Sequence, residues 1–391
     1  MRLHRTLVLL VLFLAITAIP GAAFCASAGS EQKPITLSTM GSLFFGGTVS
    51  REANGETFHG DHGYAQFYIP QNARNWPIIM WHGIGQSGRS FESTPDGREG
   101  YQALLTRDDW PVYIIDQPRR GRAGRTRAEP AVNNIPTTTN ESGVWSAFRL
   151  GRWLPPEPAT LYPVSQFPRD GAAIDQFMRQ QTGDTGELPR TPEHRTFMAK
   201  AMKDLLERTG PGILLTHSYG GQFGWGTGME SPELVKAIVA YEPGQYVFPE
   251  HELPPDVASP LEIVNTNLCP QPVPLEEFRK LTRMPILIVF GDNIAQEPGE
   301  VFNEEVWRVS FARAKQFVDA INRHGGHAEL LHLPEIGIRG NSHAPFADAN
   351  NGEIAGLLER WLAEKGLDAR DAPHRGPRKK EMPFTIPLAG E

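Results

Sequence analysis

Short apolar runs alternate along this chain with longer stretches in which apolar residues recur at helical spacing. Continuous apolar strands that alternate with helices are typical of a mostly parallel sheet covered by helices on both faces. The sequence therefore predicts an α/β fold. The runs lie at residues 77–81, 112–116, 212–215, 234–241, 284–290 and 330–333, the helical stretches at 98–106, 193–209, 304–324 and 353–365, and two leading strands at 35–49 and 63–69.

The run at residues 212–215 continues into the sequence Thr-His-Ser-Tyr-Gly-Gly at residues 216–221. A strained turn from strand to helix exposes a serine as a nucleophile, and the residues two before and two after it must be small. Gly220 meets this requirement, whereas Thr216 departs from it. The pattern favours Ser218 as a nucleophile, and the alternative is a helix that merely begins at a serine cap.

Two other runs end in a carboxylate. Glu242 follows the run at residues 234–241, and Asp292 follows the run at residues 284–290. Neighbouring parallel strands place both side chains at the same edge of the sheet as Ser218, which is the edge where open α/β sheets bind ligands. Sequence spacing alone leaves both open as the acid of a catalytic triad.

Histidines lie close together near the last predicted strand, at positions 324, 327, 332 and 343. A zinc site is the alternative to catalysis for such a group. However, neither paired cysteines nor a His-Glu-x-x-His helix accompanies these residues. We therefore expect no metal and no cofactor.

Several motifs together resemble a small group of exported bacterial esterases within the α/β-hydrolase superfamily, over about residues 36 to 365. The motifs are His82-Gly83, Thr-Pro-Asp-Gly-Arg at 94–98, Asp-Gln-Pro-Arg-Arg-Gly-Arg at 116–122, the serine turn at 216–221, and Tyr241-Glu242-Pro243. Some members of that group carry two adjacent cysteines in the loop after His-Gly, whereas this chain has Ile84-Gly85. Taken alone, the His-Gly loop is also compatible with an ordinary turn.

The resemblance implies roles for particular residues. In the group the acid is a glutamate on the strand after the nucleophile strand, which corresponds to Glu242, while most of the superfamily would place it at Asp292. The superfamily's catalytic histidine corresponds to His343 and completes the order serine, acid, histidine. The oxyanion would be held by the backbone amides of Ile84 and Tyr219.

These roles predict a serine hydrolase that cleaves carboxylic esters through an acyl-enzyme. An amidase or a lactonase with the same triad remains an alternative, because triad chemistry does not fix the leaving group. A non-catalytic binding protein of the same fold is the alternative outside enzymes. We expect a small-molecule ester as the substrate.

The first residues have the three parts of a secretory signal: Arg2 and Arg5, an apolar stretch at residues 7–19, and small residues up to Ala28. We expect cleavage after Ala28 and export to the periplasm or the medium. Cys269 would then be the remaining cysteine, so the mature chain would rely on its core rather than on a disulfide.

The net charge of −7 argues against nucleic acid or an anionic membrane as a partner. No stable membrane insertion is expected once the signal is removed, and helices beside the last strands could mediate a homodimer. The expected organisation is a signal peptide at residues 1–28, a hydrolase domain at 29–365 with an inserted cap at about 128–190, and an extended or disordered tail at 366–391.

Two stretches near the predicted site carry further expectations. The arginines at positions 119, 120, 122, 125 and 127 are predicted to form structural ion pairs, with recognition of a substrate carboxylate as the alternative. The cap is rich in Pro, Thr, Asn and Gly and carries five scattered aromatic residues: Trp145, Phe148, Trp153, Tyr162 and Phe167. These would line an apolar pocket over Ser218, or simply pack onto the sheet.

Overall fold

The computed structural model describes residues 33–124, 139–185 and 190–379. The chain divides into two units, Met1–Pro34 and Ile35–Glu391, and the architecture below is that of the second unit. The expected signal peptide lies outside the described residues, as do residues 128–138 and 186–189 of the expected cap.

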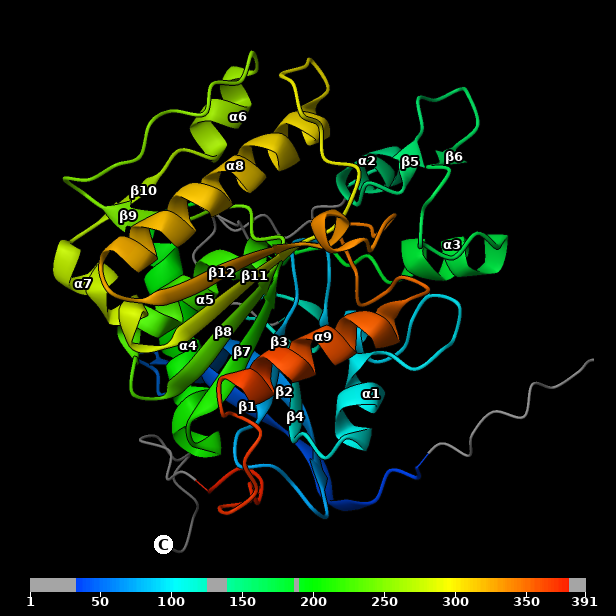
Figure 1. Cartoon of the computed structure of the whole chain (residues 1–391). Helices are drawn as coiled ribbons and strands as arrows, with labels where there is room; N and C mark the ends of the chain where they lie inside the picture. The colour runs from blue at the N-terminus through cyan, green and yellow to red at the C-terminus, as the bar shows by residue number, and fades with distance from the viewer. Residues whose placement is uncertain (1–32, 125–138, 186–189, 380–391) are drawn as a thin grey trace, which may run out of the picture. The chain divides into compact units, whose positions relative to one another are not determined.

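An eight-stranded sheet has the strand order β1-β2-β4-β3-β7-β8-β11-β12 (Figure 1). The first three strands in this order pair antiparallel, and every pairing from β4 to β12 is parallel. The predicted mostly parallel sheet is therefore confirmed. The strands are β1 (Leu37–Arg51), β2 (Thr57–Pro70), β3 (Ile78–Trp81), β4 (Val112–Asp116), β7 (Gly212–His217), β8 (Val235–Tyr241), β11 (Pro285–Phe290) and β12 (His327–His332).

The central strands are apolar throughout because both of their faces are buried. Along β7, Leu214 points into one core cluster while Ile213 and Leu215 point into the other. Successive side chains of a strand alternate between faces, so a sheet covered on both sides needs apolar residues at every position. Each fully buried side chain of this kind contributes about 1.5–3 kcal/mol relative to its exposed state.

Helices cover the two faces of the sheet, and four of them fall within three residues of the predicted helical stretches. The first core cluster joins the sheet to α4, α5, α7 and α8, and the second joins it to α1, α2, α3 and α9 (Figure 1). The helices are α1 (Tyr101–Arg107), α2 (Glu141–Ala147), α3 (Gly171–Arg179), α4 (Pro192–Thr209), α5 (Gly221–Glu230), α6 (Glu262–Asn267), α7 (Leu275–Lys280), α8 (Phe302–Arg323) and α9 (Asn351–Glu364).

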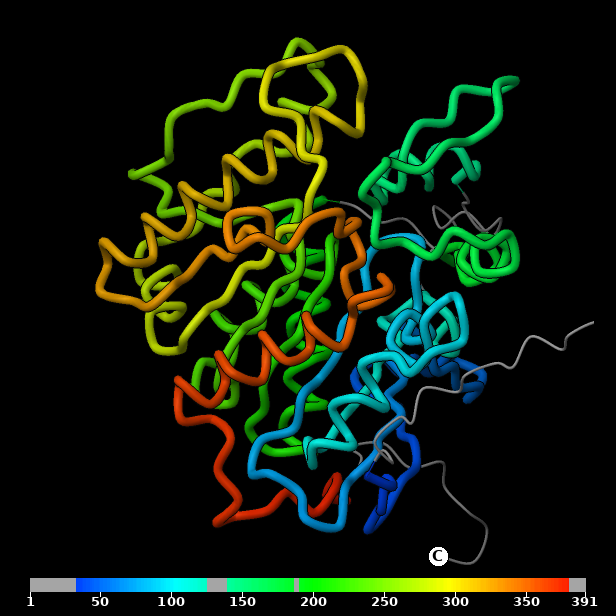
Figure 2. The backbone as a smooth tube through the Cα atoms, turned by 45° about the vertical axis from the view of Figure 1, so that its right-hand side comes forward, coloured from blue at the N-terminus to red at the C-terminus, as the bar shows by residue number. Residues whose placement is uncertain are grey.

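The described part of the expected cap, residues 139–185, contains α2, α3 and a two-stranded pair of β5 (Gly151–Arg152) and β6 (Thr160–Leu161). Figure 2 shows this segment beside the end of the sheet at which the parallel strands finish. The proline-rich region after β8 forms a second small sheet from β9 (Val247–Pro249) and β10 (Gln271–Val273). Both insertions thus follow strands of the parallel sheet.

Residues 367–379 of the expected tail form neither helix nor strand, yet they are held against the body of the unit. Arg370 donates to the Asn72 carbonyl at 2.6 Å, and the ring of His374 lies 2.9 Å from the Tyr113 hydroxyl. No helix in the described ranges combines the length and the apolar character that a bilayer crossing requires.

The predicted ion pairing of the arginines after β4 is confirmed for those that the structure describes. The pairs are Arg119 with Asp61, Arg120 with Asp184, and Arg122 with Asp116. Arg125 and Arg127 lie outside the described residues.

Candidate active site

Ser218 occupies the turn between β7 and α5. Its φ of 54° lies in the left-handed region, which costs a non-glycine residue roughly 1–3 kcal/mol. Close packing surrounds the turn, because a Cβ on Gly220 would lie 2.7 Å from the His82 carbonyl oxygen. Ser218 therefore has a strained backbone conformation, and the close packing of the turn requires a residue without a side chain at position 220.

The departure at Thr216 has a structural explanation. Thr216 is buried, and its Cγ2 would lie 3.0 Å from a Cβ built on Gly224. A glycine one turn into α5 therefore supplies the room that a glycine at position 216 would otherwise provide. In this chain the small residue is therefore in helix α5, which packs against β7, and not in the strand itself.

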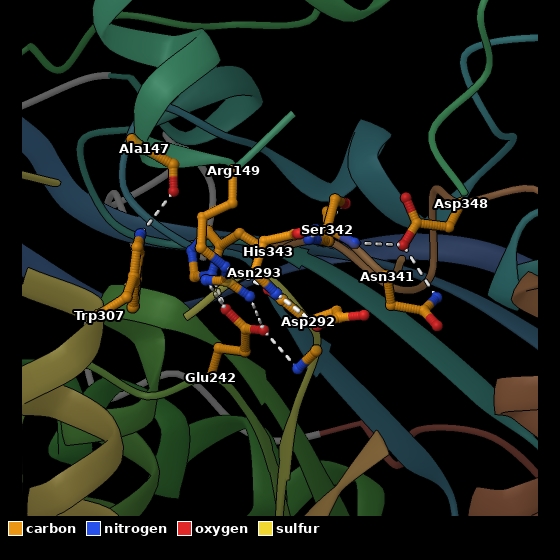
Figure 3. Close-up of polar contacts among 12 residues, drawn as sticks. Ala147, Arg149, Glu242, Asp292, Asn293, Trp307, Asn341, Ser342, His343 and Asp348 are labelled. Carbon is orange, nitrogen blue, oxygen red and sulfur yellow. Dashed lines mark hydrogen bonds and ion pairs between the residues drawn. The ribbon is translucent and has the colours of Figure 1, made fainter. Parts of the chain in front are cut away.

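Glu242 follows β8 directly and is fully buried. Its Oε2 lies 2.6 Å from Nδ1 of His343, and its Oε1 accepts a hydrogen bond from the Gly291 amide at 2.7 Å (Figure 3). The structure therefore brings together the histidine and the glutamate that the sequence singled out.

Arg149 forms a bidentate ion pair with the Glu242 carboxylate. The sequence analysis did not identify Arg149 as a residue of the site. Its Nη1 lies 2.6 Å from Oε2 of Glu242 and its Nη2 contacts Oε1 (Figure 3). Burial alone would raise the pKa of Glu242, but the Arg149 charge and the hydrogen bond with His343 outweigh it and lower the pKa to about 2. The glutamate is therefore ionised at neutral pH.

His343 is enclosed on several sides. Its backbone amide donates to the Phe148 carbonyl at 2.9 Å, the Phe148 ring lies 5.2 Å from its ring, and the Trp307 ring lies 3.9 Å away. Burial lowers the pKa of His343, and the Glu242 carboxylate partly opposes this shift. A neutral imidazole with its Nδ1 proton directed at a carboxylate has its Nε2 lone pair free to act as a base.

Asp292, the alternative acid, has other partners in this structure. Its Oδ2 accepts from the Gly340 amide at 2.8 Å, and its Oδ1 accepts from the Asn293 amide at 2.7 Å. Its own amide donates to the Asn341 carbonyl at 2.9 Å. The carboxylate of Asp292 thus fixes the start of the loop that carries His343, while His343 pairs with Glu242.

A second buried carboxyl supports the same loop and was also missed. Asp348 Oδ2 accepts from the Ser342 amide at 2.7 Å and from Asn341 Nδ2 at 3.0 Å (Figure 3). Burial raises the pKa of Asp348 to about 7, and the hydrogen bonds from Ser342 and Asn341 oppose this shift. Asp292 and Asp348 together hold residues 340–342, which lead directly into His343.

The serine turn lies against the His343 loop and the loop after β3. His217, which precedes Ser218, donates from Nε2 to the His343 carbonyl at 2.9 Å. A Cβ on Gly83 would lie 2.8 Å from Cβ of Ser218. Ser218, His343, Glu242 and the His-Gly loop therefore converge at the edge of the sheet where the parallel strands end.

The loop after β3 contains Ile84, one of the two expected oxyanion donors, and Tyr219 follows Ser218 in the turn. His82 anchors this loop: its Nδ1 lies 2.8 Å from the Gly83 carbonyl, and its Nε2 accepts from the Gln117 amide at 3.2 Å. Burial, followed by the Arg120 charge, lowers the pKa of His82 to about 4. His82 is thus a neutral structural residue at neutral pH.

A cavity of about 170 Å³ opens beside this loop. Ile84 and Phe148 lie on its wall, so it reaches from the oxyanion loop to the ring that covers His343. Among the cap aromatics, Phe148 lines the cavity and also packs in the core beside Trp145 and Phe167. Packing onto the sheet is therefore confirmed for these three residues, and the expected pocket over Ser218 stays a prediction.

The other histidines near β12 are not gathered into one site. His324 lies 3.1 Å from Glu252, and His332 lies 3.1 Å from Glu335. Within the described residues, no three side chains of His, Cys, Asp or Glu are grouped as a metal site would require.

Comparisons with known proteins agree with this fold. The family described as "Alpha/beta hydrolase family" matches residues 78–378. A probable secreted lipase, phiG, from a fungal species (strain ATCC 74256) is 28% identical over 342 residues, which span 77% of this chain and 86% of that protein. A solved structure described as a novel bacterial esterase is 29% identical with a TM-score of 0.67, over 85% of this chain and 97% of that one. With its sheet order, its strained serine turn and this family match over most of its length, the chain belongs to the alpha/beta hydrolase family and has the α/β-hydrolase fold.

Proposed function

We propose that this protein hydrolyses carboxylic esters, with Ser218 as nucleophile, His343 as general base and Glu242 as the residue that orients His343. The observation that carries the proposal is the buried contact of 2.6 Å between His343 Nδ1 and Glu242 Oε2, at the same sheet edge as a serine with a φ of 54°. A binding protein of this fold would have no need for such a pair.

In the first half of the reaction, Ser218 Oγ forms a bond to the acyl carbon while its proton passes to Nε2 of His343. The electron pair of the carbonyl moves onto its oxygen, which the amides of Ile84 and Tyr219 receive. The tetrahedral intermediate then expels the alcohol, which takes the proton from His343. An acyl group remains on Ser218.

In the second half, a water molecule gives its proton to His343 and attacks the acyl carbon. Ser218 leaves and recovers the proton, and the carboxylic acid is released. Glu242 keeps its negative charge throughout, because its pKa of about 2 is far below neutral pH, and it stabilises the imidazolium in both halves.

The choice of esters rests on the relatives. The matching proteins are described as a lipase and an esterase, which favours esters over the amides and lactones that the same triad could cleave. We also propose that the chain is exported, which the secretory pattern of residues 1–28 and the relative described as secreted both support.

Covalent labelling tests the proposed nucleophile. Ser218→Ala should abolish both the hydrolysis of p-nitrophenyl esters and labelling by a fluorophosphonate. Ser231→Ala is the matched control, because this serine is buried at the opposite end of α5. If Ser218→Ala kept its label, the nucleophile would lie elsewhere.

A further inference from the structure

The indole ring of Trp307 lies against the imidazole of His343 (Figure 3). The two ring centroids are 3.9 Å apart, and the ring planes are inclined by 36°. The ring of His217 lies 4.5 Å from the imidazole, and the Phe148 ring lies 5.2 Å away at a steeper angle of 65°. Of the rings that the structure describes around His343, the Trp307 ring is therefore the nearest.

Two parts of the chain hold the Trp307 ring in this place. Trp307 belongs to α8, and its Nε1 donates to the carbonyl of Ala147, at the end of α2, at 2.7 Å. The residue is almost fully buried, and the guanidinium carbon of Arg149 lies 5.5 Å from its ring centroid. The indole ring is therefore fixed against His343 by contacts that do not depend on His343 itself.

The proposed reaction places a positive charge on His343 in both of its halves, when the ring takes a proton from Ser218 and then from water. His343 is 2% exposed, so solvent contributes little to stabilising this charge. The charged and titratable groups against the ring are Glu242, Arg149 and His217. The Glu242 carboxylate stabilises the cation, the Arg149 charge opposes it, and His217 is neutral because burial holds its pKa well below its usual value. Further stabilisation of the cation must therefore come from uncharged groups in contact with the ring.

We propose that the aromatic face of Trp307 stabilises the cation that His343 forms during turnover. The face of an aromatic ring carries partial negative charge and attracts a cation within about 6 Å of the ring centroid, and indole is the strongest of the protein rings in this respect. In a site without water such a contact changes the population of the cation by roughly tenfold. The inference rests on the proposed ester hydrolysis, because His343 must become charged in the reaction. Trp307 acts through His343 and is thus a positioning residue.

Fluorinated tryptophans introduced at position 307 test this contact, because fluorine weakens the negative charge of the ring face with little change in its shape or in its N–H group. Along a series of mono-, di- and tetrafluorotryptophan, kcat/KM for p-nitrophenyl acetate should fall stepwise, by about tenfold in all. The acidic limb of the profile should move to lower pH, because a less stabilised cation loses its proton more readily. The same series at Trp225 is the control, since this buried indole donates to the Gln245 carbonyl at 3.0 Å and packs against Tyr246 and Phe317. It should leave both kcat/KM and the limb unchanged.

Two ordinary substitutions separate the ring face from the hydrogen bond with Ala147. Trp307→Phe and Trp307→Leu both remove the indole N–H, but only the phenyl ring keeps an aromatic face against His343. Trp307→Phe should therefore retain kcat/KM about threefold or more above that of Trp307→Leu. Equal losses in the two variants, with no effect of fluorination, would mean that Trp307 acts only through its hydrogen bond and would overturn the inference.

Titration of the His343 imidazole by NMR in the fluorinated series needs no substrate and measures the contact directly. The pKa of His343 should fall as fluorines are added at position 307. A pKa that does not move would overturn the inference and leave the proposed function intact. Absence of any ester hydrolysis by the unaltered protein would overturn the proposed function, and with it the inference that rests on it.

Discussion

Arg149 and His343 share one oxygen of Glu242: Nη1 of the arginine and Nδ1 of the histidine each lie 2.6 Å from Oε2. The arginine comes from the insertion after β4, while the glutamate and the histidine follow strands of the sheet. The insertion therefore takes part in the electrostatics of the proposed triad rather than only covering it.

Arg149→Met should affect both stability and pH dependence. Removing one partner of a buried ion pair typically destabilises a protein by about 3–5 kcal/mol. The Arg149 charge lowers the pKa values of both Glu242 and His343, so both should rise in the variant. We expect the acidic limb of the kcat/KM profile to move to higher pH, because His343 must be neutral to act as a base.

The charged and titratable groups around His343 are Glu242 and Arg149, together with the ring of His217, whose pKa burial holds well below its usual value. Arg152→Met changes an exposed arginine three residues away and is the control for Arg149→Met. A loss of activity with an unmoved pH profile would mean that Arg149 has a purely structural role.

The acid of the triad can be identified by comparing two amide substitutions. Glu242→Gln should lower kcat by roughly 10³–10⁴-fold, because an amide cannot hold the required tautomer of His343 or stabilise its cation. Asp292→Asn should mainly lower the melting temperature, since its side chain holds the backbone at Gly340. If Asp292→Asn were the inactive variant and Glu242→Gln were active, Glu242 would not be the acid.

Gly224→Ala should destabilise the protein by about 1–3 kcal/mol, because the new Cβ would lie 3.0 Å from Thr216 Cγ2. Combining it with Thr216→Ala removes that methyl group and should recover most of the loss. Chemical denaturation of the two single variants and the double variant measures this coupling. Losses that simply add would show that Thr216 and Gly224 do not compensate for one another.

Asp348 should make stability fall as pH rises. Its folded pKa of about 7 exceeds the value of about 3.9 for an unfolded aspartate, so the folded protein holds a proton that the unfolded chain releases. This contribution is complete below about pH 4 and is lost as pH rises to about 7. Asp348→Asn should flatten the free energy of unfolding over that range, and a slope unchanged from wild type would refute this assignment.

The sheet and the serine turn were predictable because their signals are local. A strand buried on both faces is apolar at every position, and the turn at residues 216–221 is one contiguous motif. The edge strand β12 was harder to delimit. It begins at His327, three residues before its predicted start, because its first positions alternate between buried and exposed and the exposed ones carry polar residues, which interrupt the apolar run. The two-residue strands of the insertion have no periodicity to detect.

Arg149 could not be found from the sequence, because its partner lies 93 positions away and an arginine between two apolar residues has no distinctive spacing. The different partners of Glu242 and Asp292 could not be predicted either, since both residues follow parallel strands at the same edge. Only the path of the loop before His343 determines which carboxylate its ring meets.

Residues 147–149 are bound at three successive positions. The Ala147 carbonyl accepts from Trp307 Nε1 at 2.7 Å, and the Phe148 carbonyl accepts from the His343 amide. The Arg149 side chain forms an ion pair with Glu242. A hinge at this point would therefore break contacts that hold Glu242 and the backbone of His343 in place. We expect residues 147–149 to stay fixed during turnover, so that substrate reaches Ser218 without the insertion swinging away as a lid.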